Sequence, residues 1–485
     1  MVERRDPAGG DRTEPVVTGI TLSSQRVRPG DVYAALPGSR AHGATYAASA
    51  AEAGAVAVLT DDAGADMCRD LDVPVLVVRE PRRLLGRLAA HVYGDPAEHL
   101  RLVAVTGTQG KTTTTRLAEA GLQASGTAAA VIGTVGTRID GVDVKTSLTT
   151  PEAPDLHALF ALMRERGVEA CAMEVSSHAL VMGRVDGVVF DVAVFTNLGR
   201  DHLDFHADVE DYFAAKASLF TPERARAGLV NVDDAYGRRL LAEATIPMRT
   251  FSTTSEADWS ARDVALTPGG STFTVRTPTG RTFSAEVPLA GDFNVSNALA
   301  AIAAFGEVGF DPEAVAGGIA ASGGVPGRLE RVDAGQDFVA VVDYAHKPDA
   351  VTAALATLRP LTEGRLIVVI GAGGDRDQGK RQVMGEIAAR LADVVVVTDD
   401  NPRSEEPAVI RAAMLSGAAE VPEAERAEVH EEGDRRAAIR LAVSLAGPGD
   451  TVVVAGKGHE TGQEVRGTVH PFDDRAVLLE ELKRR

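Results

Sequence analysis

The stretch Leu102-Val-Ala-Val-Thr-Gly-Thr-Gln-Gly-Lys-Thr-Thr113 decides how this sequence is interpreted. Its apolar first half predicts a β-strand, and the pattern over 113–122 predicts a helix. Gly107 and Gly110 let the backbone of the connecting loop turn sharply, so that its N–H groups converge on one point. Lys111 adds a full positive charge, and the start of the helix adds unpaired N–H donors. The stretch therefore predicts a cradle for the phosphates of a nucleoside triphosphate.

The loop differs from the usual phosphate-binding loop at its first position, because Val105 stands where the first glycine would fall. An ordinary glycine-rich turn between a strand and a helix is the alternative interpretation. The run Gly110-Lys111-Thr112 directly after an apolar strand favours the phosphate loop. In such a loop the Thr112 hydroxyl is a ligand of Mg²⁺.

Length and composition set wide limits on the class of protein. The 485 residues predict about three domains, and 45% hydrophobic with 25% charged residues is typical of globular proteins. The net charge of −19 argues against a nucleic-acid partner, although local cations can still bind an anionic substrate. Two cysteines exclude a disulfide framework, and no apolar run is long enough to span a bilayer. We expect a cytoplasmic monomer without membrane insertion.

Three segments differ in pattern, and together they predict an α/β fold with three domains. Residues 1–99 alternate short apolar runs with helical patterns, after a loose tail over about 1–15. Residues 100–325 are predicted to form a larger, P-loop-like ATPase domain with a mostly parallel sheet. Residues 326–485 alternate strands and helices again, which predicts a doubly wound, Rossmann-like domain.

The apolar runs locate the individual elements. Strands are predicted at 55–59, 73–78, 102–106, 169–174, 190–196, 338–343, 366–370, 394–398 and 451–455. Helices are predicted at 45–53, 81–93, 113–122 and 294–305, and the segment 259–289 is predicted to be rich in β-structure. Asn294 is expected at the start of its helix, where asparagine is a favoured cap.

Polar or glycine-rich loops follow four predicted strands of the C-terminal segment: 343–346, 371–376, 399–403 and 456–460. Ligands of doubly wound sheets bind at the carboxyl ends of the strands, so these loops predict a binding site.

Further polar residues in the central segment are candidates for a metal site. Glu174 closes a predicted strand, and a carboxylate there is expected to bind Mg²⁺, although a surface glutamate is the alternative. Four acidic or histidine residues stand within six positions: Asp201, His202, Asp204 and His206. Their spacing is not that of a zinc site, and a polar loop before a helix is the alternative. Spacing alone predicts that Lys216 is a solvated helix lysine.

Taken together, these segments resemble the Mur ligase superfamily over nearly the whole chain, from about Thr18 to Arg485. The most similar members add the third residue of the peptidoglycan stem peptide. The family has a UDP-substrate domain, a central ATPase domain and a Rossmann-like domain that binds the amino acid, which fits 1–99, 100–325 and 326–485.

The resemblance implies the residues that bind ATP and Mg²⁺. The implied ATP contacts are Gly107, Thr108, Gln109, Gly110, Lys111, Thr112 and Thr113 in the loop, Asn294 at the adenine, and Arg328 and Asp343 at ribose and phosphate. The implied Mg²⁺ ligands are Thr112, Glu174, His202 and a carbamylated Lys216. A carbamate turns the lysine cation into an anion that can hold a metal. Lys111, His202 and Lys216 are the implied catalytic residues. Gln109 and Lys347 differ from the usual Asn and Thr.

The resemblance also implies the contacts of the two other substrates. The UDP-dipeptide positions are Leu22, Ser24, Ser39, Arg40, Ala41, Thr149, Thr150, Ser176 and Arg184, while Leu148 and Met182 replace the Asn and Gln of some relatives. The diaminopimelate positions are Arg376, Asp400, Asn401, Pro402, Arg403, Gly456 and Glu460. The sequence Asp-Asn-Pro-Arg at 400–403 matches the members that add diaminopimelate, whereas lysine-adding members differ at the arginine. A pocket that selects diaminopimelate is expected to hold a cation for its far carboxylate, and arginine binds a carboxylate bidentately better than lysine does. A surface position near Glu405 and Glu406 is the alternative for Arg403.

The implied activity is the ATP-dependent addition of meso-diaminopimelate to the D-Glu of UDP-MurNAc-L-Ala-D-Glu, through an acyl phosphate, in cytoplasmic peptidoglycan precursor synthesis. A folylpolyglutamate synthetase is the nearest alternative, and the N-terminal domain and the 400–403 loop argue against it. A nucleotide-dependent switch without ligase activity is a second alternative, which would leave Asp343, Arg376 and the 456–460 loop without a task.

Overall fold

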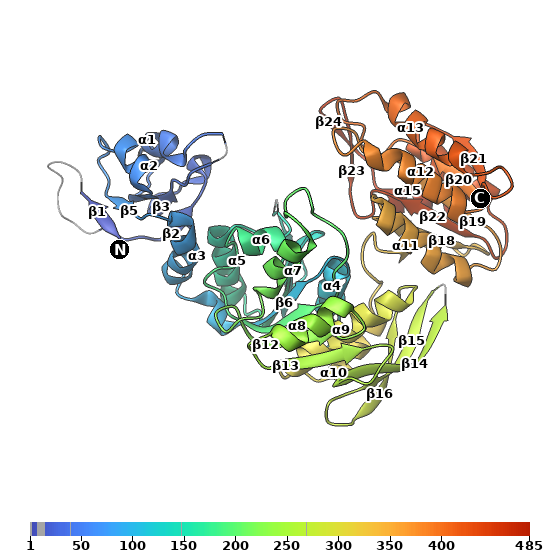
Figure 1. The fold of residues 1–485 in the computed structure, drawn as a ribbon, viewed down its shortest axis with the longest axis horizontal. Coiled ribbons are helices and arrows are strands. Elements are labelled where there is room, and N and C mark those ends of the chain that lie inside the picture. Colours follow the sequence, from blue (N-terminus) through green and yellow to red (C-terminus); the bar gives the residue numbers. More distant parts are fainter. Residues whose placement is uncertain (1, 7–14, 39, 147, 268) are drawn as a thin grey trace. The chain divides into compact units, whose positions relative to one another are not determined.

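The computed structural model describes residues 2–6, 15–38, 40–146, 148–267 and 269–485, and it is an α/β structure throughout (Figure 1). Contacts within the chain group it into two units. The first comprises 1–259 and 300–315, and the second 260–299 and 316–485. In the part of the chain that the structure describes, no helix is both long and apolar enough to cross a membrane.

The first unit begins with a five-stranded sheet in the order β1-β5-β4-β3-β2. The strands are β1 (Glu3–Arg5), β2 (Gly19–Thr21), β3 (Asp31–Ala34), β4 (Ala57–Thr60) and β5 (Val75–Val77), and the helices are α1 (Ala47–Glu52), α2 (Asp62–Met67) and α3 (Pro81–Val92). β1 pairs antiparallel with β5, so the expectation of a loose tail is wrong for 3–5. Its Glu-Arg-Arg sequence carries no apolar pattern, because a charged edge strand buries no side chain.

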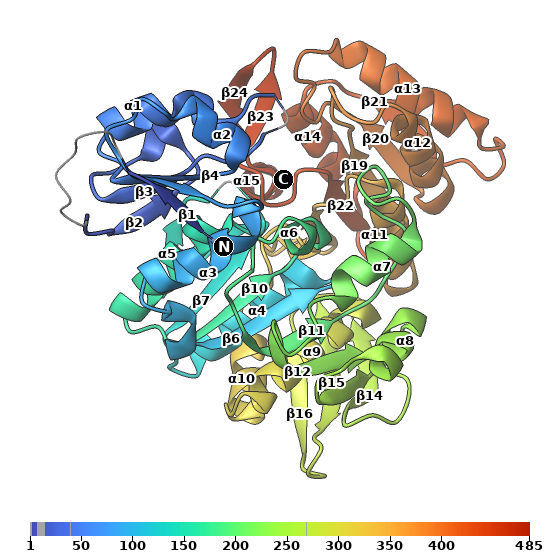
Figure 2. The same ribbon diagram turned by 60° about the vertical axis from the view of Figure 1, so that its left-hand side comes forward.

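Eight further strands of the first unit form a mostly parallel sheet in the order β13-β12-β11-β6-β10-β7-β8-β9. The strands are β6 (Arg101–Thr106), β7 (Ala129–Gly133), β8 (Gly136–Ile139), β9 (Val142–Val144), β10 (Ala170–Glu174), β11 (Phe190–Phe195), β12 (Ala225–Asn231) and β13 (Met248–Ser252). The helices are α4 (Lys111–Ala124), α5 (Ala153–Glu165), α6 (Ser177–Val181), α7 (Val209–Ala217) and α8 (Ala235–Glu243). Central β6 pairs in parallel with β10 and β11, and it leads directly into α4 (Figure 2).

The second unit holds an antiparallel meander and a doubly wound sheet. The meander consists of β14 (Trp259–Thr267), β15 (Gly270–Arg276) and β16 (Thr282–Val287), followed in the chain by α9 (Asp292–Glu307) and α10 (Pro312–Ala320). The sheet has the order β17-β18-β22-β19-β20-β21, and only β17 is antiparallel to its neighbour. Its strands are β17 (Glu330–Arg331), β18 (Val339–Asp343), β19 (Leu366–Ile370), β20 (Val394–Val397), β21 (Glu428–Glu431) and β22 (Thr451–Ala455).

Helices cover both faces of this sheet, as expected for a doubly wound fold. One core packs it against α11 (Pro348–Leu358), α12 (Gly379–Leu391) and α13 (Pro407–Glu420). The other core packs it against α14 (Arg435–Leu445) and α15 (Asp474–Arg484). A separate hairpin of β23 (Gly462–Val465) and β24 (Thr468–Pro471) follows β22.

Most predicted elements are confirmed, with shifted ends. The strands at 366–370 and 451–455 have the predicted bounds. The helix after the phosphate loop begins at Lys111 rather than at 113. The helix expected to begin at Asn294 begins at Asp292, directly after Gly291 with a φ of 100°, so Asn294 lies inside the helix and does not cap it.

Candidate active site

The loop between β6 and α4 turns sharply at its two glycines, as the sequence predicts. Gly107 and Gly110 have φ values of 147° and 88°, and a Cβ on Gly107 would lie 2.0 Å from the Thr196 hydroxyl. The Thr196 hydroxyl donates to the Gln109 carbonyl over 2.6 Å, and the Asn197 side chain accepts from the Gln109 N–H over 2.9 Å. The residues that follow β11 therefore fix the loop in a shape that only glycine permits at position 107.

Lys111 folds back over this loop. Its Nζ donates to the Gly107 carbonyl over 2.8 Å and to the Thr108 carbonyl over 3.1 Å. The ammonium is thereby held beside the start of α4, where the helix dipole adds partial positive charge. Positive charge is concentrated where the phosphates of a nucleotide are expected.

Glu174 is buried at the end of β10, with 1% of its surface exposed, so it is not the surface glutamate of the alternative interpretation. Its Oε1 accepts from the Thr112 hydroxyl and from the Thr134 N–H, both over 2.8 Å. The parallel register places Glu174 beside Val105 on β6. A carboxylate and a hydroxyl, the oxygen ligands that Mg²⁺ prefers, thus meet beside the phosphate loop.

Lys216 on α7 is buried, with 1% of its surface exposed, so the expectation of a solvated lysine is wrong. Its Nζ donates to the Gly107 carbonyl over 2.8 Å, and this carbonyl also accepts from Lys111. The Nζ lies 4.6 Å from the centre of the Tyr212 ring. Burial, and next the charge of Lys111, hold the pKa of Lys216 well below its usual range, against an opposing effect of Asp201.

His202 lies in a left-handed backbone conformation with a φ of 55°. Its ring centre is 4.8 Å from that of His178 and 6.1 Å from that of Tyr212. The Tyr212 hydroxyl lies 3.2 Å from the Thr108 hydroxyl, and burial raises the pKa of Tyr212 to about 12. Tyr212 therefore connects the loop of His202 to the phosphate loop.

The acidic and histidine residues at 201–206 do not converge on one point. His206 instead binds the Ser177 hydroxyl over 2.9 Å and Asp211 over 3.1 Å. Among the described residues, no group of three or more His, Cys, Asp or Glu side chains is arranged to hold a metal ion. The predicted Mg²⁺ set, which includes a hydroxyl and a modified lysine, is not of that kind and stays a prediction.

Residues predicted to hold the sugar peptide surround Glu174. The Thr150 hydroxyl donates to the Glu174 carbonyl over 2.9 Å and accepts from the Ser176 N–H over 3.3 Å. Arg184 donates to the Thr150 carbonyl over 3.4 Å. The hydroxyl of Thr149 lies 3.1 Å from that of Thr134, which itself contacts Glu174. The structure thus brings these four predicted residues to the end of β10.

A pocket of about 710 Å³ opens within the first unit, beside the carboxyl ends of β3, β4 and β5. Its basic lining consists of Arg79, Arg82, Arg83 and Arg224. Glu152 joins this lining to the predicted site, because it accepts from Arg82 over 3.0 Å and from Arg184 over 2.9 Å. The arginines at 79–83 were missed by the sequence interpretation, although they stand directly after a predicted strand.

The predicted uridine positions lie elsewhere in the N-terminal part. Leu22 packs against the core between β2 and α3, and Ser24 begins a short 3₁₀ turn. Arg40 and Ala41 are exposed in the loop that follows β3. Ser39 lies outside the described residues.

In the second unit, Asp343 and Arg328 are neighbours. Asp343 accepts from the Leu329 N–H over 2.7 Å and from the Ala345 N–H over 2.9 Å. Burial raises the pKa of Asp343, while Arg328 and these two N–H groups oppose the shift. Asn294 is buried in α9 and donates to the Ala290 carbonyl over 2.8 Å.

The predicted diaminopimelate residues share the loops that follow β19, β20 and β22. Asn401 donates to Glu460 over 2.9 Å, which joins the second loop to the third. Arg403, with a φ of 53°, donates from Nη1 to the Gly374 carbonyl over 2.6 Å, which joins the second loop to the first. Arg376 is exposed in the first loop. A Cβ on Gly456 would lie 2.7 Å from an Asp400 carboxylate oxygen. The Pro402 carbonyl lies against Gly374.

The alternative interpretation, a surface position, would allow Arg403 to pair with Glu405, but the two residues do not pair. Its Nε lies 3.3 Å from a carboxylate oxygen of Glu464 on β23, and its N–H donates to the Glu464 carbonyl over 3.0 Å. Glu405 binds the buried Arg381 over 2.7 Å instead. The β23–β24 hairpin, which the sequence interpretation missed, therefore fixes the backbone of Arg403.

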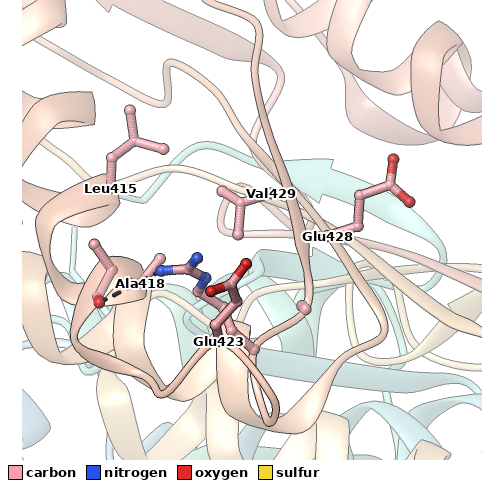
Figure 3. Close-up of a pocket in the computed structure, with 8 residues that line it drawn as sticks. Leu415, Ala418, Glu423, Glu428 and Val429 are labelled. Atoms are coloured by element: carbon pink, nitrogen blue, oxygen red, sulfur yellow. Dashed lines mark hydrogen bonds between the residues drawn. The ribbon is translucent and has the colours of Figure 1, made fainter.

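A second hollow, of about 500 Å³, lies between α13 and β21 (Figure 3). Its lining includes Leu415, Ala418, Glu423, Arg426, Glu428 and Val429. Glu428 pairs with Val394 at the amino ends of the strands. The hollow therefore lies at the amino ends of the strands, whereas the predicted amino-acid site lies at their carboxyl ends.

The phosphate loop and the three α/β sheets define a nucleotide-using α/β enzyme. The chain belongs to the Mur ligase family. Family models match it as the Mur ligase family catalytic domain at 16–93, the middle domain at 105–305 and the glutamate ligase domain at 327–458.

Several relatives similar to this chain carry the name UDP-N-acetylmuramoyl-L-alanyl-D-glutamate--2,6-diaminopimelate ligase. The Streptomyces avermitilis protein is 59% identical over 96% of this chain and 92% of its own length. The Corynebacterium glutamicum protein is 52% identical over 97% and 93%. A solved structure of that name has a TM-score of 0.70 and 33% identity, over 96% of this chain and 95% of its own.

A folylpolyglutamate synthase, the nearest alternative, is similar to this chain in its fold. The Mycobacterium tuberculosis folylpolyglutamate synthase complexed with ADP and AMPPCP has a TM-score of 0.61 and 20% identity. It covers 77% of this chain and 92% of its own length.

Proposed function

We propose that this Mur ligase adds meso-diaminopimelate to the D-Glu of UDP-MurNAc-L-Ala-D-Glu with the use of ATP. The observation that carries the substrate assignment is the presence of opposite charges on the C-terminal loops. Arg403 belongs to the Asp-Asn-Pro-Arg loop, and Glu460 accepts from Asn401 of the same loop over 2.9 Å. A cation and a carboxylate complement the far end of diaminopimelate, which carries both a carboxylate and an ammonium group.

The chemistry follows from the weakness of a carboxylate as an acyl donor. The D-Glu γ-carboxylate attacks the γ-phosphate of ATP, which gives an acyl phosphate and ADP. The amine of diaminopimelate then attacks the acyl carbon, and inorganic phosphate leaves. Lys111 and the N–H groups of the loop position the phosphates and offset their charge, which is the main contribution of a protein to phosphoryl transfer.

Mg²⁺ fits the donors beside the loop. We propose that Thr112, Glu174, His202 and a carbamylated Lys216 hold it, and that the bound ion neutralises phosphate charge. The buried contact between Glu174 and Thr112 supports the oxygen half of this set. The lowered pKa of Lys216 supports the carbamate, because only a neutral amine reacts with CO₂.

The arginine-rich pocket of the first unit is the proposed place of the anionic UDP-sugar portion. Arg82 and Arg184 share Glu152, so the pocket is continuous with the predicted sugar-peptide residues. We place the reaction in the cytoplasm and expect a monomer, which size-exclusion chromatography with light scattering would test.

Phosphate release measured with every combination of substrates tests the proposed function. Release is expected only with ATP, UDP-MurNAc-L-Ala-D-Glu and meso-diaminopimelate together, with L-lysine as a poor replacement. Phosphate release without an amino acid would support the nucleotide-dependent switch instead. Release with a folate and glutamate would support the folylpolyglutamate alternative.

Arg403→Ala is expected to weaken the use of diaminopimelate while leaving the KM for ATP nearly unchanged. Loss of a charge-assisted bidentate contact costs about 2–4 kcal/mol, or roughly thirtyfold to a thousandfold in kcat/KM. Initial rates at varied diaminopimelate measure this effect, with Arg390→Ala, an exposed arginine of α12, as the control. A wild-type enzyme that prefers L-lysine, or a variant that keeps its full preference for diaminopimelate, would contradict the assignment.

A further inference from the structure

A completely buried lysine lies among the predicted diaminopimelate residues. Lys457 follows β22 and has 0% of its surface exposed. Its Nζ is 2.9 Å from the Asn401 amide oxygen and 3.5 Å from one carboxylate oxygen each of Asp400 and Glu460. Lysine is rarely buried unless it is paired, and all three partners here are side chains of the candidate site. Neither the spacing nor the family resemblance assigned a role to this lysine.

The contact with Lys457 helps to fix the orientation of the Asn401 amide. The amide oxygen accepts from Lys457 and, over 2.9 Å, from the Glu464 N–H. The amide nitrogen donates to Glu460 over 2.9 Å. A reversed amide would turn its NH₂ group toward the donors Lys457 and Glu464, and its oxygen toward the Glu460 carboxylate. Only one orientation therefore satisfies all the partners.

Lys457 also separates two negative charges. Asp400 is 5% exposed, and the Glu460 side chain is 34% exposed, so only Glu460 is open to a ligand. The nearby Arg435 pairs with Asp474 over 2.6 Å, and both side chains are completely buried. The Lys457 ammonium thus lies against the buried Asp400, while the Glu460 side chain stays reachable from outside.

We propose that Lys457 is a positioning residue of the amino-acid site. It holds Asn401 and Glu460 in the orientation in which Glu460 receives an ammonium group of the incoming diamino acid. The inference rests on the proposed function, because that function assigns the amino acid to these loops.

Lys457→Met tests the proposal, with Lys483→Met on the exposed end of α15 as the matched control. The KM for meso-diaminopimelate is expected to rise about tenfold or more, because one charge-assisted contact is lost. The KM for ATP is expected to stay within about twofold of the wild-type value. The expected factor is moderate because the Glu464 N–H continues to hold the Asn401 amide. A general disturbance of the fold would change both KM values.

A double-mutant cycle with Glu460→Gln asks whether Lys457 acts through Glu460. If it does, the combined variant raises the KM for diaminopimelate little beyond the larger single effect. An increase in this KM for the combined variant that equals the product of the two single increases would overturn the proposal.

Folding is checked by circular dichroism and thermal unfolding. If Lys457→Met does not fold, Lys457→Gln decides, since glutamine is shorter than lysine but keeps an NH₂ group that can donate. If neither folds, Lys457 is a structural residue and the proposal is overturned. A wild type that uses no diamino acid overturns the proposed function together with this inference. An active wild type beside a Lys457→Met enzyme of unchanged KM overturns this inference alone.

Discussion

Lys111→Ala is expected to lower ATP-dependent ligation at least about a thousandfold while the protein remains folded. Removal of one preorganised charge from a phosphoryl-transfer site has effects of this size. The Lys111 ammonium binds the carbonyls of Gly107 and Thr108, within the loop that we propose to hold the phosphates. Coupled measurement of ADP release gives the rate, and circular dichroism verifies the fold.

Lys145→Ala is the control for this variant, because Lys145 is an exposed lysine of the same unit. The control is expected to keep wild-type turnover. Near-normal ligation by a folded Lys111→Ala protein would remove the basis for the phosphate-loop assignment.

Lys216→Ala is expected to lose activity about a hundredfold or more, because the carbamate that it would carry is an anion at a metal site. Formate or acetate in the buffer is expected to restore part of the activity by supplying a carboxylate in the vacated space. The same additives are expected to leave Lys111→Ala inactive. The two lysines donate to one carbonyl, so the pair of variants separates the residue that acts as a cation from the one that acts as an anion.

Carbon dioxide and pH give a second measurement on Lys216. Burial and the charge of Lys111 lower its pKa, so the amine is neutral at pH values where an ordinary lysine is protonated. Carbamylation needs that neutral amine, so activity in CO₂-depleted buffer is expected to recover on addition of bicarbonate, and less completely as the pH falls. A plain ammonium in an experimental density map, with full activity of Lys216→Ala, would refute the carbamate.

The structure was predicted well in segments where apolar and polar side chains alternate, or where apolar side chains follow one another in a run. The valine-rich runs of the C-terminal sheet became β19, β20 and β22, because buried parallel strands are continuous apolar runs. The phosphate loop and Glu174 could be placed together because parallel strands end at the same edge of the sheet.

Other features depend on contacts that no local pattern records. Lys216 is buried because the phosphate loop lies on its helix, 109 positions away in the sequence. The hairpin of β23 and β24 is short and partly exposed, so it shows little alternation, yet it determines the partner of Arg403. Lys457 is adjacent in sequence to a predicted site residue, but its burial follows from the packing of two separate strand ends.

The carbonyl of Gly107, which accepts from both Lys111 and Lys216, makes these two lysines thermodynamically interdependent. A change in the charge of one lysine therefore changes the free energy of the charged form of the other lysine. If nucleotide draws Lys111 toward its phosphates, the tendency of Lys216 to take up CO₂ changes by some factor, and uptake of CO₂ must then change the affinity for nucleotide by the same factor. Dissolved carbon dioxide would in this way act as an effector of ATP binding, through a single peptide oxygen.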